Sequence, residues 1–556
     1  MFINSYAPFG AEGIIIRVEA DIRRGIPGVD ITGLAEGAVR EARERVRAAF
    51  RNSGYAFPLD RILINLAPAG VKKEGAALDL PIALAVMAAA GLVPSPDNLM
   101  VMGELELSGS VRPVRGVLAA VDAGLKAGIR DFIVPAENVR EAAILAGKSF
   151  ADPGAAGRAR VAAAATLQEA LHALIVRAES GSLPVSDFSA GKGAAAAGTV
   201  CGDFSQVRGQ SRYKRALEIA AAGGHNLLVF GPPGAGKTML ARSLPSIMAP
   251  LTVSESVEIT RLYSLAGQIN AGKGNAVDLS LITRPPFRSP HHSASAEGIL
   301  GGGKTVRPGE ISLAHYGVLF LDEAPEFRSN VLQALREPLE DQVITISRAE
   351  GPVRLPAEFQ LILAANSCPC GRLGLRSPGN TSDGGSGLGC FCSPEEVNRY
   401  WRKFGSALLD RIELRVAVIP PDIKQLEEDR GESSVEIAKR VQRAVEIQRE
   451  RLQGLIPEGS DTAGISCRRN ARIPAGMVER CCPLTDRGTR ALREAMAKLA
   501  LSGRAYHGIL RVARTIADLE GRSSIDADHI LEAVQYRRQG DDPYDILMTP
   551  GATAPL

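Results

Sequence analysis

The sequence has few aromatic residues, little excess charge and no long apolar run, and each absence narrows what the protein can be. Phe, Trp and Tyr make up 4% of the 556 residues and 45% are hydrophobic, a composition typical of a globular chain. The net charge of +3 is too small to identify a nucleic-acid partner. Any such partner must therefore be argued from local patches of charge.

The sequence also lacks signals for export or membrane insertion. Its first residues, Met1-Phe-Ile-Asn-Ser-Tyr, have neither the basic start nor the apolar stretch of a signal peptide. The longest apolar run, residues 80–93, is too short to span a bilayer and predicts a buried helix. We therefore expect a cytoplasmic protein with no membrane partner, whose eight cysteines are thiols or metal ligands rather than disulfides.

The length predicts about three or four domains. Residues 178–200 are small and weakly periodic, as in a linker, and they separate residues 1–177 from the rest of the chain. Strand-like runs alternate with helical ones in the N-terminal region, which predicts an α/β domain. The alternation resumes in residues 201–420, whereas residues 421–556 have a helical pattern.

A glycine-rich motif follows an apolar run and fits the pattern G-x-x-x-x-G-K-[ST]. It consists of Gly231, Pro232, Pro233, Gly234, Ala235, Gly236, Lys237 and Thr238. Glycines let backbone N–H groups surround phosphate, while Lys237 is expected to reach the terminal phosphates of ATP and Thr238 to bind Mg²⁺. A fortuitous glycine loop is the alternative, and the strand-like run before the motif argues against it.

Three further elements follow in chain order and complete a predicted site for ATP hydrolysis. Asp322 and Glu323 end an apolar run, so parallel strands would present Asp322 to the metal and Glu323 to the attacking water. Asn366 ends another such run and is expected near the γ-phosphate, with an ordinary loop asparagine as the alternative. Arg411 is a candidate to neutralise phosphoryl charge, and a surface pair with Asp410 is its alternative.

The order of these motifs resembles the AAA+ superfamily and, more narrowly, the magnesium-chelatase-like ATPases called the YifB or ComM family. The resemblance covers nearly the whole chain. It is carried by Arg288-Ser-Pro-His-His292, Gly301-Gly-Gly, Arg307-Pro-Gly-Glu310-Ile-Ser-Leu-Ala-His315, Gly317-Val-Leu-Phe-Leu-Asp-Glu-Ala-Pro-Glu-Phe327 and Ala513-Arg-Thr-Ile-Ala-Asp-Leu-Glu520.

This resemblance implies a three-layer αβα ATPase core, a C-terminal helical lid, and a homo-hexameric ring with active sites between subunits. Asn366 then matches sensor 1, and Arg411 matches an arginine finger that acts on the neighbouring subunit. Arg504 is the best match to sensor 2, with Arg511 and Arg514 as competitors.

The resemblance also implies a function, because ComM-like members are associated with ATP-driven branch migration of DNA during natural transformation. We predict a DNA helicase or branch-migration factor that binds single-stranded or branched DNA and cooperates with recombination proteins. The alternative is a chelatase-type remodeller of a protein partner, which hydrolyses ATP without moving DNA.

The N-terminal region resembles the Lon-type proteolytic domain, a ribosomal S5-like α/β fold, but lacks its catalytic residues. Residues 68–77 match the segment that carries the Lon serine, with Ala77 in its place, and Ala120 stands at the lysine position. Acyl transfer is not possible without a nucleophile and its base. We therefore predict a non-proteolytic domain used for assembly or substrate contact, which argues against an ATP-dependent protease.

A glycine-rich insertion at residues 368–392 contains two Cys-x-Cys pairs, formed by Cys368, Cys370, Cys390 and Cys392. Four thiolates suit tetrahedral Zn²⁺, and such a closed site is structural rather than catalytic. A metal would order a polar loop that cannot pack a core of its own. Four free thiols on the loop are the alternative.

Residues 344–355 predict a hairpin, at the place where related AAA+ helicases have one that lines the central pore. Arg348 and Arg354 would contact DNA phosphates there, independently of base sequence, although solvated hairpin charges are the alternative. His291 and His292 lack a third metal ligand at suitable spacing, so we expect them to form structural hydrogen bonds.

Overall fold

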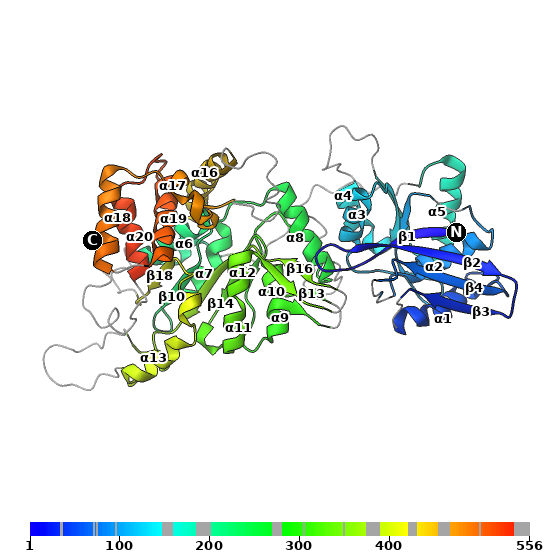
Figure 1. Cartoon of the computed structure of the whole chain (residues 1–556), viewed down its shortest axis with the longest axis horizontal. Coiled ribbons are helices and arrows are strands. Elements are labelled where there is room, and N and C mark those ends of the chain that lie inside the picture. The colour runs from blue at the N-terminus through cyan, green and yellow to red at the C-terminus, as the bar shows by residue number, and fades with distance from the viewer. Residues whose placement is uncertain are drawn as a thin grey trace.

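The computed structural model describes residues 1–33, 37–70, 73, 76–94, 97–146, 159–184, 202–269, 281–303, 306–348, 351–373, 390–420, 431–453, 468–499 and 502–538. The molecule is elongated, with an N-terminal α/β domain at one end, a second α/β domain in the middle and the C-terminal helices at the other end (Figure 1). No helix among the described residues is long and apolar enough to cross a membrane.

The N-terminal domain is built on a seven-stranded sheet in the order β3-β4-β2-β1-β5-β8-β9. Its strands are β1 (Phe2–Ala7), β2 (Ile14–Arg23), β3 (Gly28–Thr32), β4 (Arg61–Ala67), β5 (Leu99–Val101), β8 (Asp131–Pro135) and β9 (Arg160–Ala164), and β6 (Glu104–Leu105) pairs with β7 (Val111–Arg112). Its helices are α1 (Gly37–Asn52), α2 (Asp79–Ala89), α3 (Val117–Lys126), α4 (Val139–Ala146) and α5 (Leu167–Ser180).

Burial in this domain follows the sequence pattern. Side chains alternate between buried and more exposed along β4, because successive residues of a strand point to opposite faces. Helix α2 lies in the long apolar run and is buried over nearly its whole length, as the sequence predicted. Helix α5 continues through Ser180, past the predicted domain boundary at residue 177.

The second domain has a five-stranded parallel sheet in the order β11-β14-β17-β10-β18. Its strands are β10 (Leu227–Phe230), β11 (Phe287–Arg288), β14 (Val318–Leu321), β17 (Gln360–Ala365) and β18 (Leu414–Ala417). Its helices are α6 (Ser211–Gly223), α7 (Lys237–Ser243), α8 (Val253–Leu265), α9 (Ala296–Leu300), α10 (Glu310–Leu313), α11 (Ser329–Ala334), α12 (Arg336–Asp341), α13 (Pro394–Arg402) and α14 (Ser406–Leu409).

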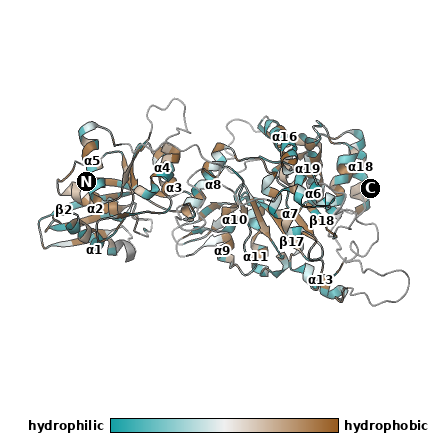
Figure 2. Ribbon diagram, turned by 180° about the vertical axis from the view of Figure 1, so that it is seen from behind, coloured by the Kyte–Doolittle hydropathy of each residue, from teal (hydrophilic) through white to brown (hydrophobic). Residues whose placement is uncertain are grey.

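Each face of the parallel sheet is covered by its own apolar cluster, which makes the three-layer αβα arrangement. Leu227 and Val229 of β10 pack into one cluster, and Leu228 and Phe230 pack into the other. Since both faces are buried, the strands read as continuous apolar runs rather than as alternating ones. Figure 2 shows this concentration of hydrophobic residues along the central strands.

The C-terminal helices share the first of these clusters with α6 and the sheet. They are α16 (Ser434–Gln453), α17 (Val478–Cys481), α18 (Asp486–Leu499), α19 (Gly503–Leu519) and α20 (Ala527–Arg538). Helices α16 and α19 pack against α6, and α18 packs against α20, which agrees with the helical pattern predicted for this part of the chain.

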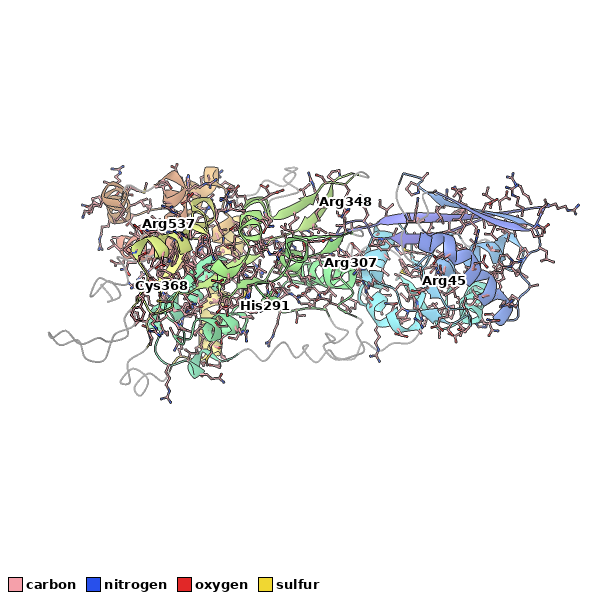
Figure 3. All side chains as sticks on the ribbon, turned by 90° about the horizontal axis from the view of Figure 1, so that it is seen from below. Arg45, His291, Arg307, Arg348, Cys368 and Arg537 are labelled. Atoms are coloured by element: carbon pink, nitrogen blue, oxygen red, sulfur yellow. The ribbon has the colours of Figure 1, made fainter. Side chains whose placement is uncertain are left out.

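Two small antiparallel hairpins extend from the second domain. One pairs β12 (Gly301–Gly302) with β13 (Arg307–Pro308), and the other, which we call the basic hairpin, pairs β15 (Val343–Ile346) with β16 (Val353–Pro356). Figure 3 shows Arg307 and Arg348 on the side that faces the N-terminal domain, whereas Cys368 and Arg537 lie farther from it.

The N-terminal domain contacts the second domain through polar and apolar groups. Asp122 of α3 forms an ion pair with Arg261 of α8 at 2.8 Å, and Ser264 of α8 donates a hydrogen bond to Glu141 of α4. The turn after β1 lies against the basic hairpin so closely that a Cβ atom at Gly10 would be 2.7 Å from Val353. The two domains therefore meet beside the predicted DNA-binding hairpin.

Candidate active site

Lys237, Thr238, Asp322 and Asn366 of the predicted site meet at one edge of the parallel sheet, whereas the predicted Arg411 and Arg504 bind Glu340 instead. Strands β14, β17 and β10 are parallel neighbours, so the residues that follow them come together at their carboxyl ends. The Thr238 hydroxyl donates to Asp322 at 2.9 Å, and the Lys237 ammonium lies 3.2 Å from the amide oxygen of Asn366. Residues that lie up to 129 positions apart in sequence thus form one site.

The phosphate loop, residues 231–238, has the backbone that its glycines predict. Gly234 and Gly236 have φ angles of +78° and +82°, a region that favours glycine, and an added Cβ atom there would meet nothing within 4 Å. Gly231 is needed for packing instead, because a Cβ atom there would lie 2.1 Å from the Val418 carbonyl oxygen. The loop can therefore bring backbone N–H groups close to a bound anion.

Lys237 begins α7 and its ammonium group is surrounded by oxygen atoms. It donates to the carbonyl oxygens of Gly231 at 2.7 Å and Pro232 at 2.9 Å. Burial lowers the pKa of Lys237 to about 8, while the charges of Asp322 and Glu323 act in the opposite direction. The site can hold a phosphate group here, because phosphate would supply the negative charge that carbonyl groups lack.

Asp322 and Glu323 follow β14 and have different environments. The Glu323 backbone has a φ of +49°, and its N–H donates to the Asp322 carboxylate at 3.0 Å. A non-glycine residue in this region is uncommon and is often found at functional sites. The turn leaves the Glu323 side chain exposed, so that it can reach a water molecule beside the phosphate loop.

Arg411 and Arg504 both bind the carboxylate of Glu340, at the end of α12. The ion pairs measure 2.5 Å from Arg411 and 2.9 Å from Arg504, and the hydrogen bond from Arg411 lowers the pKa of Glu340. The alternative prediction, an ion pair between Arg411 and Asp410, is wrong, because Arg411 binds Glu340 and Asp410 binds Arg537 at 3.1 Å. The structure therefore brings the predicted finger and the predicted sensor 2 together.

Arg511 and Arg514, the other two candidates for sensor 2, are more buried than Arg504. Arg514 is fully buried in α19, where it pairs with Asp518 at 2.9 Å and donates to backbone carbonyl groups. Arg511, on the same helix, is partly buried. The Arg504 side chain is 57% exposed, and Arg504 is the second residue of α19, whose N-cap is Ser502. Of the three, Arg504 is the one best able to reach a ligand outside the helix.

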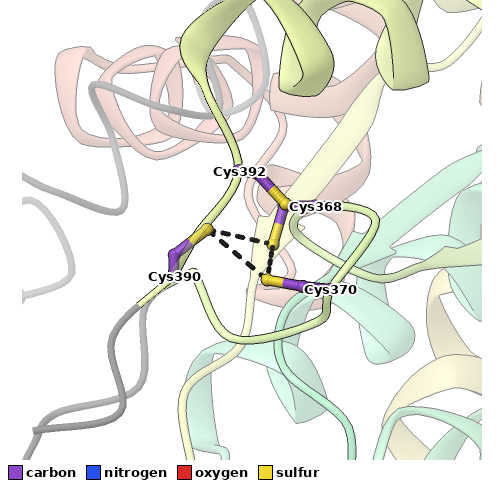
Figure 4. Close-up of side chains that lie close together, drawn as sticks. All are labelled: Cys368, Cys370, Cys390 and Cys392. Carbon is purple, nitrogen blue, oxygen red and sulfur yellow. Dashed lines mark hydrogen bonds between the residues drawn. The ribbon is translucent and has the colours of Figure 1, made fainter.

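The four cysteines of the insertion come together in a compact cluster (Figure 4). Their sulfur atoms all lie within 4.8 Å of one another, with Cys368 at 3.3 Å from Cys370 and 3.5 Å from Cys390. Tetrahedral zinc thiolate bonds of about 2.3 Å place sulfur atoms about 3.8 Å apart, so the donor set fits a Zn²⁺ ion. The intervening residues 374–389 lie outside the described part of the chain.

The electrostatics of the cluster also suit a metal ion. Burial raises the pKa of the Cys370 thiol, but hydrogen bonds from the Arg372 backbone and the neighbouring thiols outweigh it and lower the pKa to about 6. Burial raises the pKa of Cys390 to about 12. One thiolate is therefore favoured at neutral pH, and a cation would stabilise the others.

The basic hairpin is present as predicted, with Arg348 and Arg354 both exposed. Arg354 pairs across the hairpin with Thr345, and Arg348 donates to the Gly303 carbonyl oxygen of the neighbouring hairpin. His291 lies outside both hairpins and binds Ser293 at 2.8 Å, a local hydrogen bond of the kind expected for it.

The two positions that would carry a protease dyad contain no reactive group. Ala120 is fully buried in an apolar cluster of the N-terminal domain, and Ala77 packs against the same cluster. The buried carboxylate that follows, Asp79, is bound by Arg45 at 2.7 Å. The structure thus places both positions together, in surroundings that suit packing and not acyl transfer.

Sequence reasoning missed several residues that support the site. Gln210 holds the phosphate loop by donating to the carbonyl oxygens of Ala235 at 3.1 Å and Ile419 at 2.6 Å. Tyr213 donates to the Lys237 carbonyl oxygen at 3.1 Å. Glu340 was also missed. These residues lie far from their partners in sequence and belong to no local motif, so only the fold reveals them.

Three protein-family models together match most of the chain. The family model of magnesium chelatase subunit ChlI matches residues 203–426, and its C-terminal counterpart matches residues 431–537. A third, described as subunit ChlI of Mg-chelatase, matches residues 18–138. The N-terminal region, the ATPase core and the helical lid are thus each matched.

Two individual relatives match nearly the full length of this chain. The chain is 39% identical to protein YifB of Salmonella typhimurium, over 96% of this chain and 96% of that protein. It is 38% identical to competence protein ComM of Haemophilus influenzae, over 96% of this chain and 97% of the relative. A shorter match, 25% identical over 25% of this chain and 17% of the relative, is to a Lon protease of Geobacter metallireducens.

Proposed function

Because this chain belongs to the YifB/ComM family of magnesium-chelatase-like AAA+ proteins, we propose that it hydrolyses ATP as a hexameric motor that acts on DNA. The observation that carries the proposal is the convergence of Lys237, Thr238, Asp322 and Asn366 at one edge of the sheet. In this family context, that constellation supports a nucleoside triphosphatase. The proposal includes a cytoplasmic location.

Each side chain of the site has a role in the proposed reaction. Lys237 neutralises phosphate charge, and the Thr238 hydroxyl and the Asp322 carboxylate would hold Mg²⁺, which would supply further positive charge to the phosphates. Glu323 orients the attacking water and accepts its proton. Asn366 keeps that water beside the γ-phosphate through its amide group. The four cysteines hold a structural Zn²⁺.

The arginines support a hexamer in which each site is completed by a neighbour. Arg411 and Arg504 share the Glu340 carboxylate, so a single cluster carries both cations. A cluster with two arginines and one carboxylate keeps an excess of positive charge and suits a phosphate group of an adjacent subunit. We propose that this cluster acts in trans, with Arg411 as the finger and Arg504 as sensor 2.

The proposal that the motor acts on DNA rests on the basic hairpin and on one relative, which is named a competence protein. Arg348 and Arg354 are exposed there, whereas Ile344 and Leu355 on the inner side are buried. Arginines on an exposed hairpin suit phosphate contacts that do not depend on base sequence. The proposed substrate is single-stranded or branched DNA, moved in cooperation with recombination proteins.

Steady-state ATP hydrolysis, measured with and without single-stranded and branched DNA, tests this function. We expect DNA to stimulate hydrolysis, and we expect the double variant Arg348→Ala, Arg354→Ala to lose most of that stimulation with an unchanged basal rate. Arg487→Ala with Arg490→Ala is the matched control, since it removes two exposed arginines from α18, which lies among the C-terminal helices and away from the basic hairpin. Hydrolysis that no DNA affects would favour a remodeller of a protein partner instead.

A further inference from the structure

The cysteine cluster is joined directly to the predicted sensor residue. Asn366, Ser367 and Cys368 are consecutive, and the Leu373 N–H donates to the Cys368 sulfur atom at 3.4 Å. Cys368 is fully buried at the carboxyl end of β17. Only two peptide bonds separate Cys368 from Asn366, so a bond that fixes the Cys368 sulfur atom also restricts the position of Asn366.

A second connection runs through Trp401 of α13. Its indole N–H donates to the Ser367 carbonyl oxygen at 3.1 Å, and its ring meets the Phe230 ring edge to face, with centroids 5.1 Å apart. Phe230 directly precedes Gly231, the first residue of the phosphate loop. Trp401 is 6% exposed, so it is fixed between the chain that leads to the cluster and the strand that leads to the phosphate loop.

Helix α13 is in turn anchored at the cluster. It begins at Pro394, just after Cys392, with a capping box formed by Ser393 and Glu396. A bond between the two cysteine pairs would therefore hold the start of α13 against the end of β17.

A third contact joins the first cysteine pair to the phosphate loop. The Gly371 N–H donates to the Cys368 carbonyl oxygen at 3.0 Å, which closes the turn around Cys370. A Cβ atom at Gly371 would lie 3.1 Å from the Pro233 ring, so this turn lies against the phosphate loop. A side chain at Gly371 would also be strained, because its φ angle is +75°.

We propose that a metal ion at the four cysteines positions Asn366 and the phosphate loop, so that metal occupancy sets the rate of ATP hydrolysis. The ion joins Cys368 and Cys370 to Cys390 and Cys392, and Trp401 carries this constraint to the site. The inference rests on the proposed function, both for the metal and for the ATPase. Trp401 is a positioning residue, since it touches Ser367 and Phe230 and not the reacting atoms.

The test compares a variant that removes two ligands with a matched control on the same segment. Cys390→Ser with Cys392→Ser removes one pair, whereas Phe391→Ala removes the 74%-exposed residue between them. Because Trp401 is the single tryptophan, its fluorescence reports the state of this link without a label. Zinc content, emission of Trp401, affinity for ATP, and kcat and KM for hydrolysis are measured on the full-length protein.

We expect the double cysteine variant to lose zinc, shift its Trp401 emission to the red and lose about tenfold or more in kcat, with a smaller change in affinity for ATP. Phe391→Ala should resemble the wild type in each measurement. Removing zinc from the wild type with a chelator should shift the Trp401 emission to the red and lower kcat. Adding zinc back should reverse both changes. Trp401→Phe should keep the zinc and still lose several-fold in kcat.

Several results would overturn the inference, and they differ from those that would refute the function. A variant that loses zinc but keeps its Trp401 emission and kcat would show that the ion only orders the insertion. Wild-type protein that hydrolyses ATP in the presence of Mg²⁺ but with no ion at the four cysteines would also overturn the inference while leaving the ATPase intact. Wild-type protein that contains zinc but hydrolyses no ATP would refute the proposed function and, with it, the claimed control of rate.

Discussion

Two buried carboxylates of the N-terminal domain and the phosphate-loop lysine of the ATPase core have different kinds of partner. In the N-terminal domain, Asp79 is bound by Arg45, and Asp131 is bound by Arg160 and Arg177, each ion pair at 2.7 Å. In the ATPase core, the ammonium of Lys237 is held by carbonyl and amide oxygens. Asp79 and Asp131 thus have cationic partners within the protein, whereas Lys237 is bound by uncharged oxygen atoms, as is the buried Lys73 of the N-terminal domain, which donates to the Pro68 carbonyl oxygen.

What distinguishes Lys237 from the buried Lys73 is its position in the phosphate loop, next to Asp322 and Asn366. A buried carboxylate with an arginine partner stabilises one arrangement of the chain, and Ala77 and Ala120 add packing without reactivity. A buried lysine with a lowered pKa suits a ligand that brings negative charge. The similarity to a Lon protease covers a quarter of this chain and concerns fold, whereas the candidate catalytic residues that come together lie in the ATPase core.

The largest effect is expected from Glu323→Gln, which removes the proposed base and keeps the size of the side chain. Hydrolysis should fall by at least about a hundredfold while ATP still binds, because loss of a general base slows the chemical step. Phosphate release and equilibrium binding of ATP measure the two quantities separately. A variant that hydrolyses ATP at the wild-type rate would remove Glu323 from the mechanism.

A smaller effect, and of another kind, is expected from Arg45→Ala in the N-terminal domain. Asp79 would be left buried without its partner, which should destabilise this domain by about 3 kcal/mol. Faster hydrogen exchange in α2 and β4 of the full-length protein would report the loss. Arg43→Ala, on the same helix but exposed, is the control and should cost less than about 0.5 kcal/mol.

The distinction between the roles of Asp79 and Lys237 would be wrong if Arg45→Ala left hydrogen exchange in α2 unchanged but abolished ATP hydrolysis. In that case the ion pair would serve the reaction, and the N-terminal domain could not be treated as a support for the ATPase core.

The smallest effect concerns pH. Lys237 has a pKa of about 8 because of burial, and bound phosphate should keep it charged, so that binding above this pH takes up a proton. The affinity for ATP should be constant below pH 8 and about tenfold weaker at pH 9. Binding to Glu323→Gln, followed by calorimetry in buffers of different ionisation enthalpy, measures both the affinity and the proton. Equal affinity at pH 7 and pH 9 would contradict this role of Lys237.

The sequence predicted the parts of the site that follow strands. The apolar runs before Gly231, Asp322 and Asn366 indicated parallel strands, and parallel strands bring their carboxyl ends to one edge. The helical runs of the sequence at residues 38–52, 117–127, 434–452 and 526–537 correspond to α1, α3, α16 and α20, each of which begins within a residue of its run. Strong periodicity accounts for this agreement.

What the sequence could not predict depends on contacts between distant residues. Arg411 was expected either to act as a finger or to pair with Asp410, but it binds Glu340, 71 positions earlier, which also binds Arg504. The contact of Trp401 with Phe230 likewise spans most of the ATPase core. Nothing local distinguishes such side chains from other arginines, glutamates or aromatic residues, because their partners are set by packing.

The most direct test of a motor whose sites lie between subunits is to mix two inactive variants. Lys237→Ala lacks the phosphate-binding lysine, and Arg411→Ala lacks the finger, so neither should hydrolyse ATP alone. At equal amounts, random assembly gives about a quarter of the interfaces an intact lysine on one side and an intact finger on the other. We predict that mixing restores up to about a quarter of the wild-type rate. A mixture of co-assembled subunits as inactive as its components would contradict the account.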